Sequence, residues 1–120
     1  MAREFHPGDV LIFQLESGFG LLKVLAVDEI ATGETVWHLA AFEDLYLDAE
    51  MADNALQNIS NLRFSEKHLA LTNRAFESTP TARMGNYGVT IEETEAIQAW
   101  QVNPSRKTLD TSIRLLLGLR

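Results

Sequence analysis

Three apolar runs of strand length, separated only by short polar turns, occupy the first third of the chain. They cover residues 10–15, 19–27 and 35–42. Such runs, alternating or continuous in apolar character, are typical of β-strands. The turn between the first two contains Gly18, which accepts a positive φ at no steric cost. Strands joined by connections this short run antiparallel, because a parallel pair needs a longer crossover. The sequence therefore predicts an antiparallel meander.

Two glycine-containing stretches refine this prediction. Pro7, Gly8 and Asp9 predict a tight turn into the first strand. Gly20 lies inside the second run, where a glycine indicates a bulge or a close approach of another group to the backbone.

The remainder of the chain mixes further strands with helices. Strands are predicted over residues 62–72 and 82–89, and helices over residues 50–59, 90–102 and 105–118. The chain shows no internal repeat and no linker long enough to separate two domains. A single α+β domain over residues 1–120 follows, with a mainly β part at 5–72 that contains one helix, and a helical part at 90–118.

The two C-terminal helices rest on different signals. Thr90 and Glu93 have the spacing of a capping box, which predicts a helix start. After residue 105, apolar residues such as Leu109 and Ile113 repeat on one helical face, while Leu115 lies off it. A helix that is apolar beyond one face either packs deep in the fold or meets another molecule. We therefore weigh intramolecular packing of this helix against a homodimer.

The strand and helix patterns together predict a hydrophobic core. Its expected members are Val10, Ile12, Leu22, Val24, Leu39, Leu56, Ile97, Trp100, Ile113 and Leu116.

The segments FHPGDV (residues 5–10) and GFGLLKVL (residues 18–25) resemble the opening hairpin of an SH3-like or Tudor-like small barrel. The resemblance covers residues 5–42. Similar hairpins occur in bacterial transcription factors that bind RNA polymerase, in KOW-type ribosomal modules and in some toxin-antagonising immunity proteins. The resemblance implies a small antiparallel SH3-like barrel or curved sheet with C-terminal helices, and binding of proteins, peptides or nucleic acids. KOW-type members that bind RNA are basic around the hairpin, whereas this chain carries only Lys23 there.

Composition and missing motifs exclude several classes of protein. The chain has no cysteine, which excludes disulfides, zinc–thiolate sites and a cysteine nucleophile. No run of eighteen apolar residues is present, so no membrane span is expected, and the N-terminus lacks the apolar stretch of a secretion signal. We therefore predict a cytoplasmic location. Phosphate-binding, dinucleotide-binding and nucleophile-elbow motifs are missing, so we expect no cofactor and no catalysis.

Charge is distributed unevenly along the chain, whose formal net charge is −7. Residues 1–60 contain two basic and eleven acidic side chains, and residues 61–120 contain eight basic and six acidic ones. An acidic first half repels a polyanion, so nucleic-acid binding is not expected there. Solubility is the simplest explanation of the charge. The alternative is an acidic face that holds a basic protein partner, formed by Glu43, Asp44, Asp48 and Glu50.

Three histidines are the remaining candidates for chemistry. His6, His38 and His68 are widely spaced, and the simplest interpretation is three separate surface or half-buried side chains. A metal site would require all three to converge with a carboxylate.

The leading functional hypothesis is a non-catalytic bacterial protein-binding module, an immunity-type antagonist or an adaptor, whose acidic face holds a basic partner. One alternative is a small histidine-dependent metal or small-molecule enzyme. The other is a nucleic-acid binder that uses the basic C-terminal half.

Overall fold

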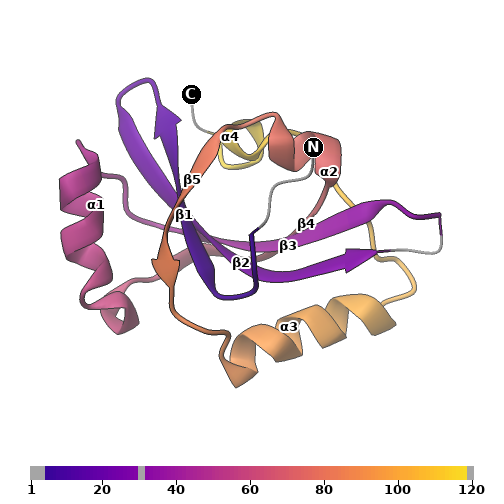
Figure 1. Ribbon diagram of the computed structural model, residues 1–120. Helices are drawn as coiled ribbons and strands as arrows, with labels where there is room; N and C mark the ends of the chain where they lie inside the picture. Colours follow the sequence, from indigo (N-terminus) through magenta and orange to yellow (C-terminus); the bar gives the residue numbers. More distant parts are fainter. Residues whose placement is uncertain (1–4, 30–31, 119–120) are drawn as a thin grey trace.

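The computed structural model describes residues 5–29 and 32–118, and within them one antiparallel sheet forms. Its strands are β1 (Asp9–Leu15), β2 (Gly18–Glu29), β3 (Thr35–Phe42), β4 (Phe64–Thr72) and β5 (Thr81–Asn86). The order β4-β3-β2-β1-β5 makes β1 to β4 a meander, and β5 returns to the other side of β1 (Figure 1). The predicted meander is confirmed. Among the described strands β4 and β5 are the two edges and do not pair, so this sheet is open.

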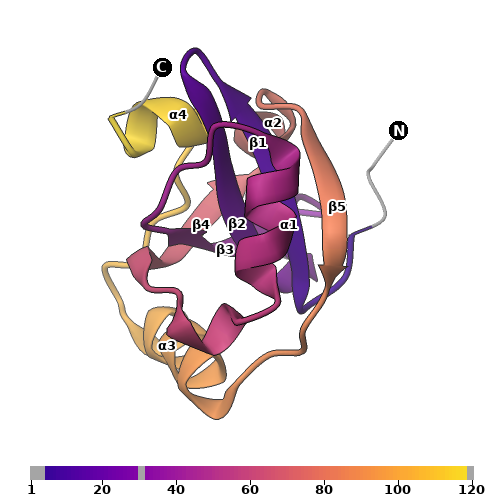
Figure 2. The same ribbon diagram turned by 90° about the vertical axis from the view of Figure 1, so that its left-hand side faces the viewer.

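Short helices cover both faces of the sheet. They are α1 (Ala49–Leu56), the 3-10 turn η1 (Ile59–Asn61), α2 (Asn73–Glu77), α3 (Ile91–Val102) and α4 (Ile113–Leu116). α2 and α4 lie on one face, and α1 and α3 lie on the other (Figure 1 and Figure 2). The predicted α+β class is therefore confirmed. No helix in the described ranges is long and apolar enough to cross a membrane.

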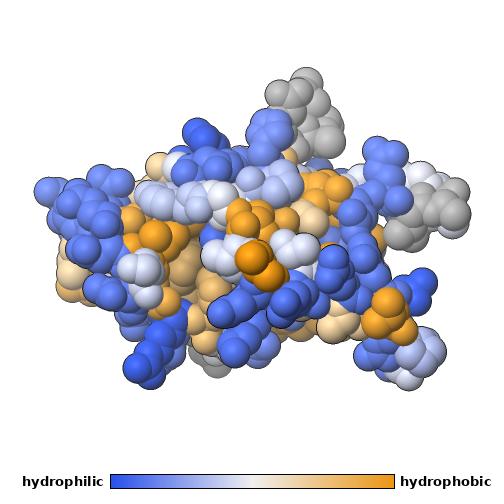
Figure 3. Space-filling model, turned by 90° about the horizontal axis from the view of Figure 1, so that it is seen from below, coloured by the Kyte–Doolittle hydropathy of each residue, from blue (hydrophilic) through white to orange (hydrophobic). Residues whose placement is uncertain are grey.

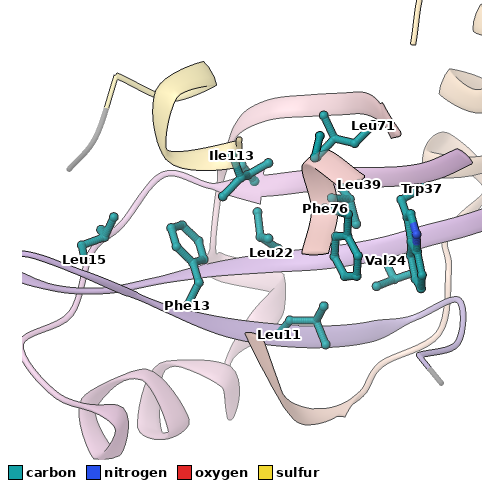
Figure 4. Close-up of a cluster of buried hydrophobic side chains, with 12 residues drawn as sticks. Leu11, Phe13, Leu15, Leu22, Val24, Trp37, Leu39, Leu71, Phe76 and Ile113 are labelled. Atoms are coloured by element: carbon teal, nitrogen blue, oxygen red, sulfur yellow. The ribbon is translucent and has the colours of Figure 1, made fainter. Parts of the chain in front are cut away.

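The larger hydrophobic cluster fills the face under α2 and α4 (Figure 4). Trp37 of β3 stacks on Phe76 of α2 with ring centroids 4.1 Å apart, and its indole N–H donates to Asn73 at 2.9 Å. These contacts bury two large aromatic side chains while satisfying the polar edge of one. Further buried members are Leu11, Phe13, Leu15, Leu22, Val24, Leu39, Leu71 and Ile113.

The opposite face is covered in two separate parts. Ala52 and Leu56 of α1 pack over the end of the sheet formed by β1 and the start of β2. Ile97 of α3 packs over Leu25 of β2 and Ala40 of β3. The three strands β1 to β3 are therefore buried on both faces, which explains why their sequences are nearly continuous in apolar residues.

Several local predictions are confirmed. A Cβ atom at Gly20 would lie 2.5 Å from the Phe13 ring, so the glycine allows the predicted close approach, while the bulge in β2 lies between Val24 and Ala26. The Thr90–Glu93 capping box is formed. Eight of the ten predicted core residues are buried, and the other two, Trp100 and Leu116, are half-buried.

The predicted helix over residues 105–118 is wrong except at its end, where α4 forms. Leu109 instead lies beside β4, where its N–H donates to the Ala70 carbonyl at 2.7 Å and its carbonyl accepts from the Thr72 N–H at 2.9 Å. Because the N–H and carbonyl groups of Leu109 are hydrogen-bonded to the edge strand β4, they do not require the hydrogen bonds of a helix. Asp110 next to it accepts hydrogen bonds from Thr72 and Arg74, which fixes the extended segment.

We predict that the C-terminal segment stabilises the domain through Ile113, which is 2% exposed within the main core. Ile113→Ala should lower the free energy of unfolding by about 2–4 kcal/mol, because it leaves a cavity among packed side chains. Leu115→Ala is the matched control, since Leu115 is 71% exposed, and it should change stability by less than about 0.5 kcal/mol. Urea unfolding measures both. Equal effects would show that the segment is not part of the core.

Candidate functional site

Helix α3 covers its face of the sheet with few apolar contacts. Its two buried side chains are Ile97, at the centre, and Glu93, at its start. Near its end, the half-buried Trp100 reaches the sheet as well. Polar groups of the sheet therefore lie beneath both ends of the helix, and they are the strongest concentration of buried polar chemistry in the described residues.

A chain of three hydrogen-bonding side chains lies beneath the end of α3. His38 of β3 is fully buried, and its Nδ1 is 2.8 Å from Nε2 of His68 on β4. Nε2 of His38 is 2.8 Å from Oδ2 of Asp28 on β2. His38 lies on the face opposite Trp37, as strand alternation predicts. Two of the three histidines therefore converge with a carboxylate, and the expectation of three separate side chains is wrong.

The carboxylate determines how protons are arranged along this chain. Asp28 accepts a hydrogen bond from Nε2–H of His38, so a neutral His38 has a bare Nδ1. That nitrogen accepts from Nε2–H of His68, and the lone pair of His68 is then on Nδ1. Burial lowers the pKa of His38, against the opposing charge and hydrogen bond of Asp28. Burial, and then the charge of His38, lowers the pKa of His68 to about 4.

Trp100 packs edge-on against both imidazoles, with ring centroids 5.0 Å from His38 and 6.1 Å from His68. Its own indole N–H donates to the Lys107 carbonyl at 3.1 Å, and the Arg106 guanidinium lies 5.8 Å from its ring centroid. The aromatic cover restricts access of water to the imidazoles. An aligned carboxylate–imidazole–imidazole chain can hold or transfer a proton.

The third histidine has a different place in the structure. His6 precedes β1, its side chain is 76% exposed, and its backbone N–H donates to Oδ2 of Asp9 at 2.8 Å. Asp9 is buried and also accepts from Arg83 and Asn86 of β5. Burial opposes ionisation of Asp9, but these hydrogen bonds lower its pKa overall. Asp9 thus holds the predicted turn and β5 together.

No metal-binding group is evident in residues 5–29 and 32–118, because no three His, Asp or Glu side chains there are arranged to hold an ion. Both ring nitrogens of His38 are already hydrogen-bonded. Within the described residues, no hydroxyl side chain is hydrogen-bonded to the imidazole of His38 or of His68.

A buried ion pair lies beneath the start of α3. Nζ of Lys23 on β2 is 2.9 Å from Oε1 of Glu93, and the two side chains are 6% and 8% exposed. The same Oε1 accepts from the Thr90 N–H at 2.8 Å, as part of the capping box. One carboxylate therefore both caps the helix and neutralises the only basic side chain of the sheet interior among the described strands.

The four predicted partner-binding acids lie on one exposed segment, residues 43–51, which runs from the end of β3 into the first turn of α1. Glu43, Asp44, Asp48 and Glu50 are all exposed. Asp48 also has a structural role, because its Oδ1 accepts from the Met51 N–H and caps α1. A small hollow beside this segment is lined by Glu43 and Asp44 together with Asn61 and Arg63.

Apolar side chains are exposed between these acids. Leu47 is 76% exposed, and Leu45 and Met51 are also exposed. The segment is nevertheless fixed to the sheet, because Tyr46 and Phe19 exchange backbone hydrogen bonds of 2.7 and 2.8 Å. Apolar side chains exposed singly are common on protein surfaces, but three within seven residues of a fixed backbone mark a candidate contact surface.

Two basic side chains of the second half are paired with acids. Arg83 pairs with Asp9 at 2.9 Å, and Arg74 pairs with Asp110. Such pairing leaves less basic surface for phosphate contacts than the sequence count indicates.

The partners that meet in the two buried clusters were not predicted from the sequence. Strand alternation placed His38 on the face away from Trp37, but the pairing with His68 depends on the register of β3 against β4, which sets His38 opposite Ala70. Lys23 offered a clearer signal, because a lone lysine in an apolar strand predicts a buried acidic partner. Glu93 was assigned only to the capping box.

No protein-family model, curated protein or solved structure matches this chain.

We predict that acidification destabilises the domain through His68. Between about pH 4 and pH 6.5 the His68 imidazole binds a proton in the unfolded chain but stays neutral in the folded one. Its contribution to the free energy of unfolding is therefore fully present above this range and is lost as the pH falls through it. Urea unfolding at pH 7.5 and pH 5 should show a loss of about 1–2 kcal/mol.

His68→Gln should reduce that loss, because the glutamine amide can donate to Nδ1 of His38 but does not titrate. His6→Gln is the control, and it should keep the wild-type pH dependence. An identical loss of stability in the wild type and His68→Gln would contradict the assignment.

Proposed function

We propose that the protein is a non-catalytic binding module that holds a basic protein partner on residues 43–51. The observation that carries this proposal is the exposure of Leu47, at 76%, between four exposed carboxylates. Burying a leucine side chain that was exposed to water is favourable by about 1.5–3 kcal/mol. A partner that covers Leu47 would gain this free energy on binding.

The carboxylates determine what kind of partner fits. Glu43, Asp44 and Glu50 attract lysine and arginine side chains and repel acidic proteins and nucleic acids. Charges at the rim of an interface mainly accelerate association and select the partner, while the apolar centre supplies affinity. A basic surface with an apolar pocket or side chain at its centre complements this segment.

The backbone of the segment is held in place before any partner arrives. The Phe19–Tyr46 hydrogen bonds fix its middle, and the Asp48 cap fixes its end. A hydrogen bond of 2.8 Å from the Glu43 N–H to the Arg63 carbonyl fixes its start. Binding then requires little additional ordering, which favours affinity.

The resemblance to SH3-like small barrels is consistent with this function. An antiparallel meander whose last strand returns to β1 supports the resemblance, and barrels of this kind mostly bind proteins, peptides or nucleic acids. Immunity-type proteins that hold a basic nuclease toxin, and adaptors of the transcription machinery, are the two kinds of binding module that this proposal includes.

We predict that charge reversal on the segment abolishes capture of basic proteins. Immobilised wild-type protein should retain basic proteins from a native bacterial lysate at low salt, and Asp44→Lys/Glu50→Lys should retain at least about tenfold less of them. Glu66→Lys/Glu95→Lys makes the same change in net charge on other exposed residues and should retain them normally.

Leu47→Ser should also reduce retention without changing charge, whereas Leu115→Ser, at another exposed leucine, should not. Quantitative mass spectrometry of the retained proteins measures all five samples. Retention that is equal for the segment variants and their controls would refute the proposal.

A further inference from the structure

A cavity of about 290 Å³ opens between η1 and the start of α3. Figure 3 shows apolar surface in the hollow between the α1–η1 region and α3, surrounded by polar side chains. A cavity of about 150 Å³ accommodates benzene, so this one has room for a ring and a substituent. Its apolar lining consists of Phe42, Ile59, Leu62, Phe64 and Tyr87.

The polar part of the lining consists of the buried Lys23–Glu93 pair together with Ser60, Thr90 and Glu92. An ammonium group has three N–H donors, and within the described part of the chain Nζ of Lys23 has one acceptor, Oε1 of Glu93. Oε1 also accepts from Thr90, whereas Oε2 has no hydrogen-bond donor among the described residues. The pair therefore presents N–H donors and a carboxylate acceptor side by side.

Stability does not explain why a charged pair lines an apolar cavity. A buried ion pair is often no more stable than apolar side chains of similar volume, since desolvation offsets the attraction. A recognition role explains the arrangement, because polar groups in an apolar pocket orient a ligand.

We propose that this cavity binds a small neutral molecule with a carboxamide group on a compact apolar body. The carboxamide oxygen accepts from Nζ of Lys23, and its NH₂ group donates to Oε2 of Glu93. The apolar body packs against Phe42 and Phe64. A carboxylate is a poorer match, because Glu93 already neutralises Lys23 and Glu92 adds a second negative charge to the lining. This site is separate from residues 43–51 and does not depend on the function proposed for them.

Benzamide is the probe that tests the proposal, with benzoate and toluene as comparisons. Titration of ¹⁵N-labelled protein followed by NMR should shift amide signals from residues 59–64 and 87–93. For so small a ligand we expect a dissociation constant of about 1 mM. Benzoate and toluene should bind at least about tenfold more weakly, because one adds a charge and the other lacks the hydrogen-bonding group.

The variant Lys23→Met/Glu93→Gln removes the charged pair but keeps an oxygen that can cap α3. Its dissociation constant for benzamide should rise by about tenfold or more, while its dissociation constant for toluene should be unchanged or lower. Ser60→Trp, on the exposed rim of the cavity, should also reduce benzamide binding, and Ser105→Trp, which lies outside the lining, should not.

Thermal unfolding of each variant shows that it is folded. Absence of benzamide shifts in the wild type would overturn the proposal, and so would equal binding of benzamide, benzoate and toluene. Shifts that the rim substitution leaves unchanged would place the ligand elsewhere and would also overturn it.

Discussion

The sheet is apolar on both faces in its three central strands, and the arrangement of the helices follows from that constraint. A strand buried on both sides requires cover above and below. One face receives the aromatic pair Trp37–Phe76 and Ile113 of α4. The other face receives α1 over one end and α3 over the middle. Cover by separate short helices leaves boundaries between them, and the cavity lies at one such boundary.

The cover supplied by α3 explains why polar groups are buried where they are. Ile97 is the one buried apolar side chain of α3. The two ends of the helix contact polar groups instead, Lys23 at its start and the His38–His68 pair near its end. The Lys23–Glu93 pair is neutral overall, and unprotonated imidazoles add no further charge beside the Asp28 carboxylate, which limits the cost of burying these groups. The attachment of α3 therefore depends on protonation at one end and on an ion pair at the other. The same arrangement places the Asp28–His38–His68 side chains at one end of α3 and the cavity beside Lys23 and Glu93 at the other.

Local sequence signals predicted the parts of the fold that depend on neighbouring residues. The meander follows from short turns between apolar runs, and the start of α3 follows from the Thr90 capping box. The C-terminal helix was predicted too long, because an apolar repeat cannot show that Leu109 finds its backbone partners on the edge of β4. The buried clusters depend on register and on helix placement, which join residues up to 70 positions apart, as in Lys23–Glu93. The acidic segment was predicted from charge, but the exposure of Leu47 within it was not.

Native-state hydrogen exchange tests most directly whether α3 is held mainly by polar contacts. Amide protons of α3 should exchange through local opening, at a free energy well below that of global unfolding, while those of the central strands β2 and β3 exchange only with global unfolding. The difference should widen from pH 7.5 to pH 5, because opening of α3 exposes the His68 imidazole to water, where it binds a proton more readily. If α3 and the central strands exchanged with the same free energy at both pH values, the helix would be an integral part of the core, and this account of its attachment would be wrong.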